Sequence, residues 1–261
     1  MNFVTQILHL VGSGATAYIS ARNMRDPLTR PHTLAALQLA ESGSVPFLEA
    51  LRDRATAEGD VWLAERLDRH ANDERRHGQI FAQALKQLNK QVIDFQNLPQ
   101  TTTEGTPEER QRSPFFEAYF EGYGSEDLKP AAIDWTVFIA STYILELDAS
   151  KDFVRMAHVL PDADPRSASL KKGILSVAQD ETRHAAYLRE ALERRVTPTE
   201  ATAIIAAWRT RKVNALLAMV GTFLQKGGQS PTLAEEAKPT QAQTQAGSEP
   251  LRREEIVGAG R

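Results

Sequence analysis

The chain contains no cysteine, which excludes disulfides, thiolate metal sites, rubredoxin-type iron centres and a cysteine nucleophile. It also carries little net charge, with a formal value of -3 and an isoelectric point of about 6.1. Such a balance provides no general attraction to nucleic acid or to anionic membranes. We therefore expect no nucleic-acid partner.

Long apolar runs are also missing from the sequence. No run reaches the roughly 18 residues that a membrane span needs. The first twenty residues lack a basic region, which argues against a secretory signal. No segment shows the sustained alternation that is typical of a β-strand. We therefore expect a soluble, cytoplasmic, all-α protein without a membrane span.

One short motif occurs twice in the chain, as Asp73-Glu74-Arg75-Arg76-His77 and as Asp180-Glu181-Thr182-Arg183-His184. Both copies contain Glu-x-x-His, and on a helix these two side chains lie on one face and can converge on one point. A Glu-x-x-His alone is expected by chance roughly 0.5 times in a chain of this composition, but the full motif only about 0.002 times. The repetition is therefore a real signal.

The hydrophobic periodicity predicts six helices. Their expected ranges are 3–22, interrupted by Gly12 and Gly14, then 33–57, 60–90, 130–160, 167–195 and 198–224. Residues 94–114 are rich in Pro, Thr and Gln and predict a long crossover between the second and third bundle helices. We divide the chain into an N-terminal helix and linker (1–31), a four-helix bundle (32–195), an additional C-terminal helix (196–226) and a disordered tail (227–261).

Acidic and imidazole side chains interrupt the apolar stripe at the centre of each of the four bundle helices. Glu41 and Glu146 do so on one helix of each half, and a Glu-x-x-His motif follows on the next helix. Glu74 follows Glu41 by 33 residues, and Glu181 follows Glu146 by 35. Antiparallel helices joined by short turns would bring these positions to one level.

Four carboxylates in one dry core could not all remain ionised, because each costs several kcal/mol to bury and each repels the others. Two divalent cations would bring four positive charges against the four negative ones. Oxygen-rich sites with two imidazoles suit iron or manganese, whereas the absence of thiolate disfavours structural zinc. The pattern therefore predicts a pair of metal ions bridged by carboxylates.

A lone Glu on two helices and Glu-x-x-His on the other two resemble the ferritin-like di-iron carboxylate bundles. The two motif copies look most like those of acyl-carrier-protein desaturases and of the hydroxylase subunits of bacterial multicomponent monooxygenases. The resemblance implies six ligands for two iron ions, with an Mn/Fe pair as the variant: Glu41, Glu74, His77, Glu146, Glu181 and His184. It implies that Glu74 and Glu181 bridge the metals.

Four further residues of the motifs would support these ligands. Asp73 and Asp180 would hold ligand imidazoles in the correct tautomer, and Arg76 and Arg183 would pair with the two aspartates. We expect no catalytic residue beyond the metal ligands.

The resemblance implies a non-haem di-iron oxidoreductase of the oxygenase or desaturase type, which activates dioxygen to oxidise an organic substrate. An external ferredoxin or reductase would supply electrons, since no flavin or nicotinamide motif is recognisable. One alternative is a ferroxidase or peroxide-scavenging, rubrerythrin-like protein without a rubredoxin domain. Another is a metal-stabilised helical scaffold without enzymatic activity. An apolar cavity at the metals would favour the oxygenase, and a tightly filled bundle the ferroxidase.

Several other residues have more than one reading. His70 lies on the same stripe as His77. It is either a third imidazole ligand or a hydrogen-bonded core residue. Tyr187 could relay electrons but is better explained by packing. The aromatic segment 115–123 either walls a substrate cavity or covers the bundle, and Asp148 is expected to face solvent. The last helix is expected to dock on the bundle or on a second subunit, as in a homodimer.

Overall fold

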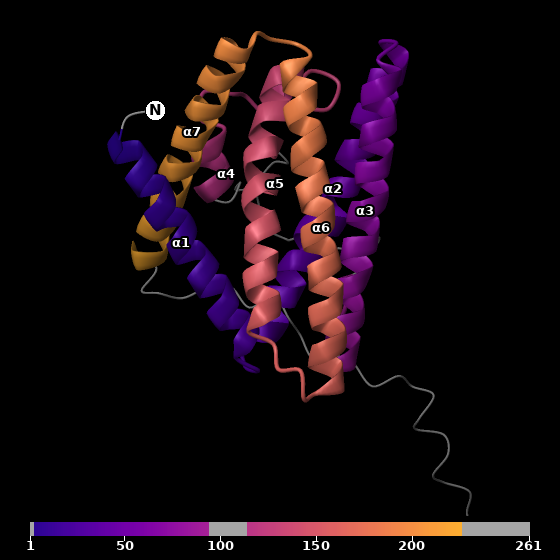
Figure 1. The fold of residues 1–261 in the computed structure, drawn as a ribbon, viewed down its shortest axis with the longest axis vertical. Helices are drawn as coiled ribbons and strands as arrows, with labels where there is room; N and C mark the ends of the chain where they lie inside the picture. Colours follow the sequence, from indigo (N-terminus) through magenta and orange to yellow (C-terminus); the bar gives the residue numbers. More distant parts are fainter. Residues whose placement is uncertain (1–2, 94–113, 226–261) are drawn as a thin grey trace, which may run out of the picture.

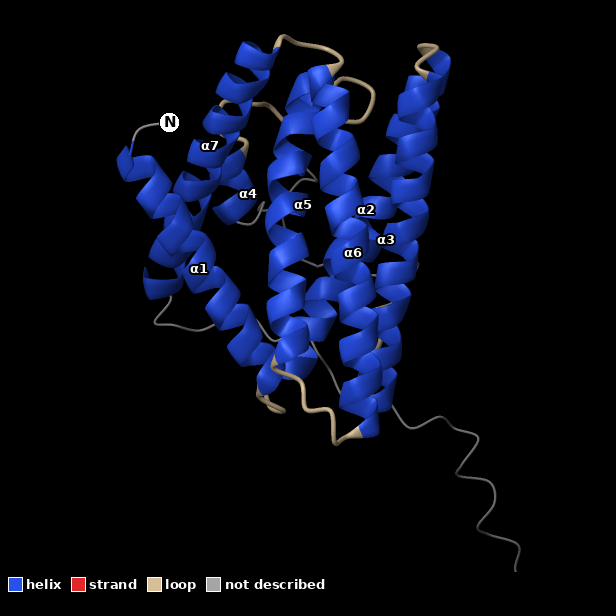
Figure 2. Cartoon of the chain, viewed as in Figure 1, coloured by secondary structure: helices blue, strands red, loops and turns tan. Residues whose placement is uncertain are grey.

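The computed structural model describes residues 3–93 and 114–225. Within these ranges the chain is helical and has no strand, which confirms the all-α prediction (Figure 2). The helices are α1 (Phe3–Arg25), α2 (Arg30–Ala57), α3 (Val61–Gln87), α4 (Pro114–Tyr119), α5 (Trp135–His158), α6 (Pro165–Glu193) and α7 (Pro198–Gln225), with a 3₁₀ turn at Glu126–Leu128.

Four long helices run side by side along the long axis of the molecule (Figure 1). α2 packs on α3, α5 packs on α6, and α3 faces α6, so that two helical hairpins lie against each other. Close backbone contact between α2 and α5 is absent from the described part of the chain. α1 and α7 cover the outer side of α5, and the short α4 packs against α7.

Aspartate caps begin three of the long helices. The Asp60 carboxylate accepts the backbone N–H of Leu63, Asp134 accepts those of Thr136 and Val137, and Asp164 accepts those of Arg166 and Ser167. Each such cap typically contributes about 1 kcal/mol. A capping box begins α7, since Thr197 and Glu200 exchange hydrogen bonds there.

The structure corrects the predicted interruption of the first helix and the predicted start of the third bundle helix. α1 continues through Gly12 and Gly14, because glycine costs a helix only about 1 kcal/mol relative to alanine. A Cβ at Gly12 would lie 3.1 Å from Leu216 Cδ1, so glycine permits the close approach of α1 and α7. The third bundle helix begins at Trp135 rather than near residue 130, after the Asp134 cap.

The apolar core consists of two clusters at the two ends of the bundle. One includes Leu51, Leu67 and Leu188, and the other includes Phe81 and Ile174. Full burial of such a side chain contributes about 1.5–3 kcal/mol. The two clusters enclose a layer of polar side chains about midway along the helices.

Asp148 does not face solvent, contrary to the prediction. It is buried on α5, and its Oδ2 accepts a hydrogen bond of 2.5 Å from Lys212 Nζ on α7. The helical pattern correctly placed Asp148 on the side of α5 that faces away from the polar layer. It did not predict that α7 covers this side. This buried ion pair therefore connects α7 to the bundle.

Some sequence predictions fall on residues outside the described ranges. These are the tail 227–261 and all of the predicted crossover 94–114 except Pro114, which begins α4. Of the helices that the structure describes, none is apolar enough over a sufficient length to span a membrane.

Candidate metal centre

The six residues predicted as metal ligands come together in the polar layer. α2 contributes Glu41, α5 contributes Glu146, and the two motif helices α3 and α6 contribute the rest. Within the described ranges, side-chain nitrogen and oxygen atoms form two groups, each with all its atoms within 4.8 Å of one another. The groups are Glu41, Glu74, His77 and Glu181, and His70, Glu146 and His184.

His77 is fully buried and presents Nδ1 to three carboxylates. This nitrogen lies 3.1 Å from Glu41 Oε2, 3.2 Å from Glu181 Oε1 and 3.6 Å from Glu74 Oε1. Its carboxylate neighbours therefore come from α2, α3 and α6.

His184 presents its Nδ1 in the same way. The distances are 3.4 Å to Glu181 Oε2, 3.6 Å to Glu74 Oε1 and 3.9 Å to Glu146 Oε2. Glu74 and Glu181 thus lie close to both imidazoles, whereas Glu41 lies close to His77 and Glu146 close to His184. This is the arrangement that two terminal and two bridging carboxylates require.

The outer nitrogens of both imidazoles are held by aspartates from the opposite hairpin. His77 Nε2 lies 3.1 Å from Asp180 Oδ2, and His184 Nε2 lies 3.2 Å from Asp73 Oδ2. Arg76 forms an ion pair with Asp180, and Arg183 forms ion pairs with both aspartates. In a neutral imidazole, an Nε2–H donated to aspartate would leave Nδ1 with its lone pair toward the centre, as a metal ligand requires.

His70 also lies in the layer, although the sequence left its role open. Its Nε2 is 3.2 Å from Glu74 Oε1 and 3.5 Å from Glu146 Oε1, and its Nδ1 is 2.7 Å from the Tyr187 hydroxyl. Its ring stacks on that of His184 with 3.7 Å between the centroids. Tyr187 therefore does more than pack, since it holds the outer nitrogen of a buried imidazole. The signal was the position of His70 one turn before Glu74.

The metal-free cluster balances its charges with protons. Burial and the Glu146 carboxylate raise the pKa of Glu181 to about 7. Burial and the Glu74 carboxylate likewise raise the pKa of Glu41 well above its usual range. Burial alone would lower the pKa of His77, but contacts with Glu181, Glu41 and Glu74 outweigh it and raise that pKa to about 11.

Glu74, in contrast to Glu41 and Glu181, has a lowered pKa and remains ionised. Burial acts to raise its pKa, but the contacts with His70 and His77 lower it to about 2. Protonated imidazoles beside ionised carboxylates occupy the place that cations would otherwise take.

The donor atoms of this layer fit a pair of divalent cations. Glu181 Oε1 is buried and has no hydrogen-bond partner in the described part of the chain, since the nearby His77 Nδ1 bonds to Glu41 instead. A carboxylate oxygen without a donor is costly to bury, and a cation would remove that cost. Four carboxylates with imidazoles, and no thiolate, match the preferences of iron and manganese.

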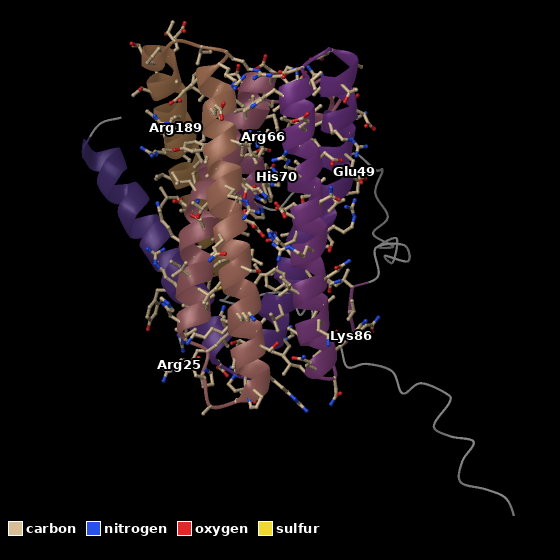
Figure 3. The ribbon with its side chains drawn as sticks, turned by 45° about the vertical axis from the view of Figure 1, so that its right-hand side comes forward. Arg25, Glu49, Arg66, His70, Lys86 and Arg189 are labelled. Carbon is tan, nitrogen blue, oxygen red and sulfur yellow. The ribbon has the colours of Figure 1, made fainter. Side chains whose placement is uncertain are left out.

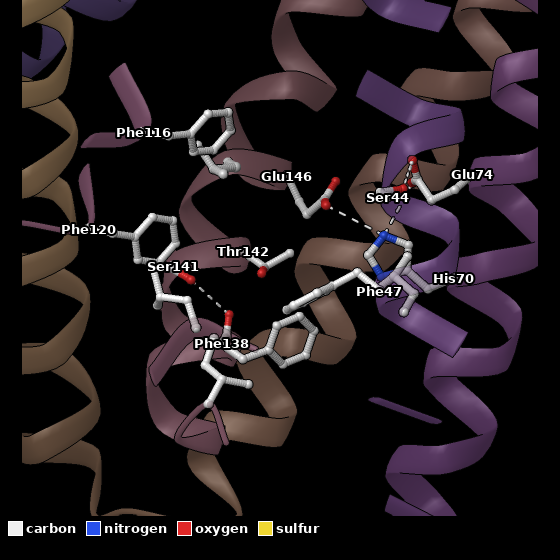
Figure 4. Close-up of a pocket in the computed structure, with 14 residues that line it drawn as sticks. Ser44, Phe47, His70, Glu74, Phe116, Phe120, Phe138, Ser141, Thr142 and Glu146 are labelled. Carbon is white, nitrogen blue, oxygen red and sulfur yellow. Dashed lines mark hydrogen bonds and ion pairs between the residues drawn. The ribbon is translucent and has the colours of Figure 1, made fainter. Parts of the chain in front are cut away.

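An apolar cavity of about 330 Å³ adjoins the cluster in the gap between α2 and α5. Its floor is formed by His70, Glu74 and Glu146, as Figure 4 shows. Its other walls are mainly apolar and include Phe47, Leu48, Phe116, Phe120, Phe138 and Leu145. Within the aromatic segment 115–123, Phe116 and Phe120 line this cavity, whereas Tyr119 is buried against Trp208 of α7 and donates a hydrogen bond to the Ser141 carbonyl of α5.

Comparison of the chain with models of protein families, with curated proteins and with solved structures finds no match.

Proposed function

We propose that this chain is a ferritin-like di-iron four-helix bundle that uses dioxygen to oxidise a small apolar organic molecule. The observation that supports this function best is the apolar cavity, because three residues of the cluster, His70, Glu74 and Glu146, line it. The two motif copies, with their resemblance to desaturase and monooxygenase motifs, support the di-iron part of the proposal.

The six predicted ligands would hold the two iron ions, with Glu74 and Glu181 between them. Bound iron would supply the redox chemistry with dioxygen that protein side chains cannot perform. Electrons would come from a ferredoxin or a reductase, because the chain carries no recognisable flavin or nicotinamide site.

The protein's own contribution is to orient the donor atoms and to bury them between apolar side chains. Asp73 and Asp180 fix the two imidazoles with Nδ1 directed inward. The hydroxyl of Ser44 donates a hydrogen bond of 2.7 Å to the backbone carbonyl of Glu41, which places its oxygen 3.3 Å from Glu74 Oε2 and so restricts the space around that carboxylate. The apolar clusters above and below the layer keep the carboxylates in a medium of low dielectric constant, where they bind cations strongly.

The cavity also limits the substrate. A cavity of about 150 Å³ lined by apolar side chains accommodates a benzene molecule. A volume of about 330 Å³ therefore fits a molecule of one or two rings, or a short alkyl chain of similar size. Its apolar walls favour a neutral substrate whose oxidised position lies against the carboxylate floor.

The same cavity distinguishes this proposal from the two alternatives. A ferroxidase or peroxide scavenger needs only a narrow path for small polar species, and a scaffold needs no cavity. Neither role explains why aromatic side chains of the segment 115–123 line a space beside the predicted metal ligands.

The test is to load the metal-free protein with Fe²⁺ without oxygen and then mix it with dioxygen and a panel of small aromatic and alicyclic compounds. We expect two iron ions per chain and an oxidised product from one class of compound. The isosteric variant Glu181→Gln should lose both, and Glu65→Gln, which alters an exposed residue of α3, should lose neither. Rapid iron oxidation with no organic product would refute the oxygenase and favour the ferroxidase.

A further inference from the structure

We infer that His70 supplies a third imidazole to the metal pair, so that the two ions have unequal surroundings. One ion would be bound by two imidazoles, His70 and His184, together with Glu146. The other would be bound by His77 and the carboxylate of Glu41. Glu74 and Glu181 would lie between them. This inference rests on the metal centre proposed above.

The geometry of His70 matches that of the two motif histidines. Its side chain is 2 % exposed, and Nε2 points at the carboxylates of Glu74 and Glu146, as the dashed lines in Figure 4 show. Its other nitrogen is engaged by the Tyr187 hydroxyl, just as those of His77 and His184 are engaged by aspartates. Coordination through Nε2 would place the proton on Nδ1, which would then donate to the tyrosine oxygen.

His70 also breaks the repeat that relates the two halves. Each motif residue recurs 107 positions later, as Glu74 does in Glu181 and His77 in His184. The position that corresponds to His70 is Val177, and the one that corresponds to Tyr187 is Ile80. The polar pair that joins α3 and α6 on one side of the repeat is thus replaced by apolar residues on the other side, where Val177 is buried in a hydrophobic cluster and Ile80 packs against it.

This difference argues against a purely structural histidine. The apolar pair shows that the corresponding place in the bundle can be filled by hydrophobic packing. A buried imidazole and a buried hydroxyl cost free energy to desolvate, and replacing such groups by apolar ones is often neutral or stabilising. A metal bond formed by Nε2 would offset that cost, and it explains why the polar pair occurs on one side only.

One ion of the unequal pair would face the apolar cavity. Both His70 and Glu146 line the apolar cavity, so the ion with two imidazoles would be the one that faces the substrate. His70 lies about midway along the helices, in the interior of the bundle (Figure 3). Imidazole favours iron over manganese, whereas carboxylate suits manganese. We therefore expect the cavity-facing site to select iron more strongly than the other site.

The test uses Co²⁺ as a paramagnetic, coloured probe of the full-length metal-free protein. A coordinated imidazole gives a strongly shifted, exchangeable N–H signal in the proton NMR spectrum of a cobalt protein. We expect three such signals and two Co²⁺ ions per chain. His70→Gln should remove one signal. It should also lower the affinity for one of the two Co²⁺ ions by more than the 10–100-fold that is typical of losing an outer hydrogen-bond partner.

Two control variants separate coordination from positioning. Tyr187→Phe keeps the imidazole of His70 but removes the hydroxyl that contacts its Nδ1. It should therefore keep three shifted signals and lower the affinity for one Co²⁺ ion by about 10–100-fold. His158→Gln alters an exposed histidine at the end of α5 and should change neither quantity.

The outcomes are distinguishable. Two signals in the unmodified protein, with two ions bound, would overturn the inference even if His70→Gln failed to fold, while the di-iron proposal would stand. No binding of Co²⁺ or Fe²⁺ by the unmodified protein would overturn both.

Discussion

Removal of the metal ions should make the stability of this protein fall as the pH rises from 7 to 9. In the metal-free cluster the pKa of His77 is raised to about 11, because contacts with three carboxylates outweigh the effect of burial. In the unfolded chain a histidine has a pKa near 6.5. Its stabilisation is therefore complete below pH 6.5 and is lost as the pH rises through 11.

The magnitude follows from the number of protons bound. One extra proton on the folded protein changes the free energy of unfolding by about 1.4 kcal/mol per pH unit. From pH 7 to pH 9 His77 alone should lower that free energy by about 3 kcal/mol. His184, whose pKa is also raised despite its burial, should add to the loss. For a chain of this size, about 3 kcal/mol corresponds to a fall in melting temperature of roughly 6–12 °C.

Circular dichroism melts at pH 7, 8 and 9 with a chelator present would measure the effect, beside melts of the iron-loaded protein. Metal binding requires neutral imidazoles, so the loaded protein should keep or gain stability over the same interval. The variant His77→Gln, measured without metal, should show a smaller fall. A metal-free melting temperature that is constant or rises between pH 7 and pH 9 would refute the reasoning.

Three further predictions concern single side chains. Asp180→Asn removes the carboxylate that holds the outer nitrogen of His77, and chelator competition should show that the metal affinity falls by about 10–100-fold. Leu145→Trp fills part of the cavity at a cost of about 1–3 kcal/mol of overpacking, and product analysis should show substrate oxidation lost while iron content stays at two per chain. Lys212→Met removes the closest cation to Asp148 and should cost about 3 kcal/mol in urea unfolding, which Asp148→Asn should partly recover. An unchanged iron affinity, an unchanged product yield or an unchanged unfolding midpoint would contradict each in turn.

Helical periodicity was sufficient to predict which side chains of the four long helices face the interior of the bundle. Glu41, Glu74, Glu146 and Glu181 interrupt apolar stripes at one level, and the structure brings all four together around His77 and His184. The stripes predict this because a helical pattern fixes a face, and two short turns fix the relative height of neighbouring helices. The iron, the substrate and the reaction remain predictions.

What the sequence did not predict depends on contacts between distant helices. The cavity exists because α2 and α5 stand apart while α3 and α6 lie close, and no local pattern encodes that difference. Asp148 was assigned to solvent because the helix that covers it, α7, begins fifty residues later. His70 was visible on its stripe, but its partner Tyr187 lies 117 residues away in the sequence.

The exchange of aspartates between the hairpins has a consequence for the architecture as a whole. Asp73 serves the histidine of the second hairpin and Asp180 that of the first, which is the reciprocal pattern of an isologous interface. A peptide that spans residues 30–93 contains the core glutamate Glu41 and one motif copy, whose Asp73 would hold the histidine of a second copy. Two such peptides should therefore supply four carboxylates and two motif histidines to one layer by self-association, with His70 in both copies and no counterpart of Tyr187.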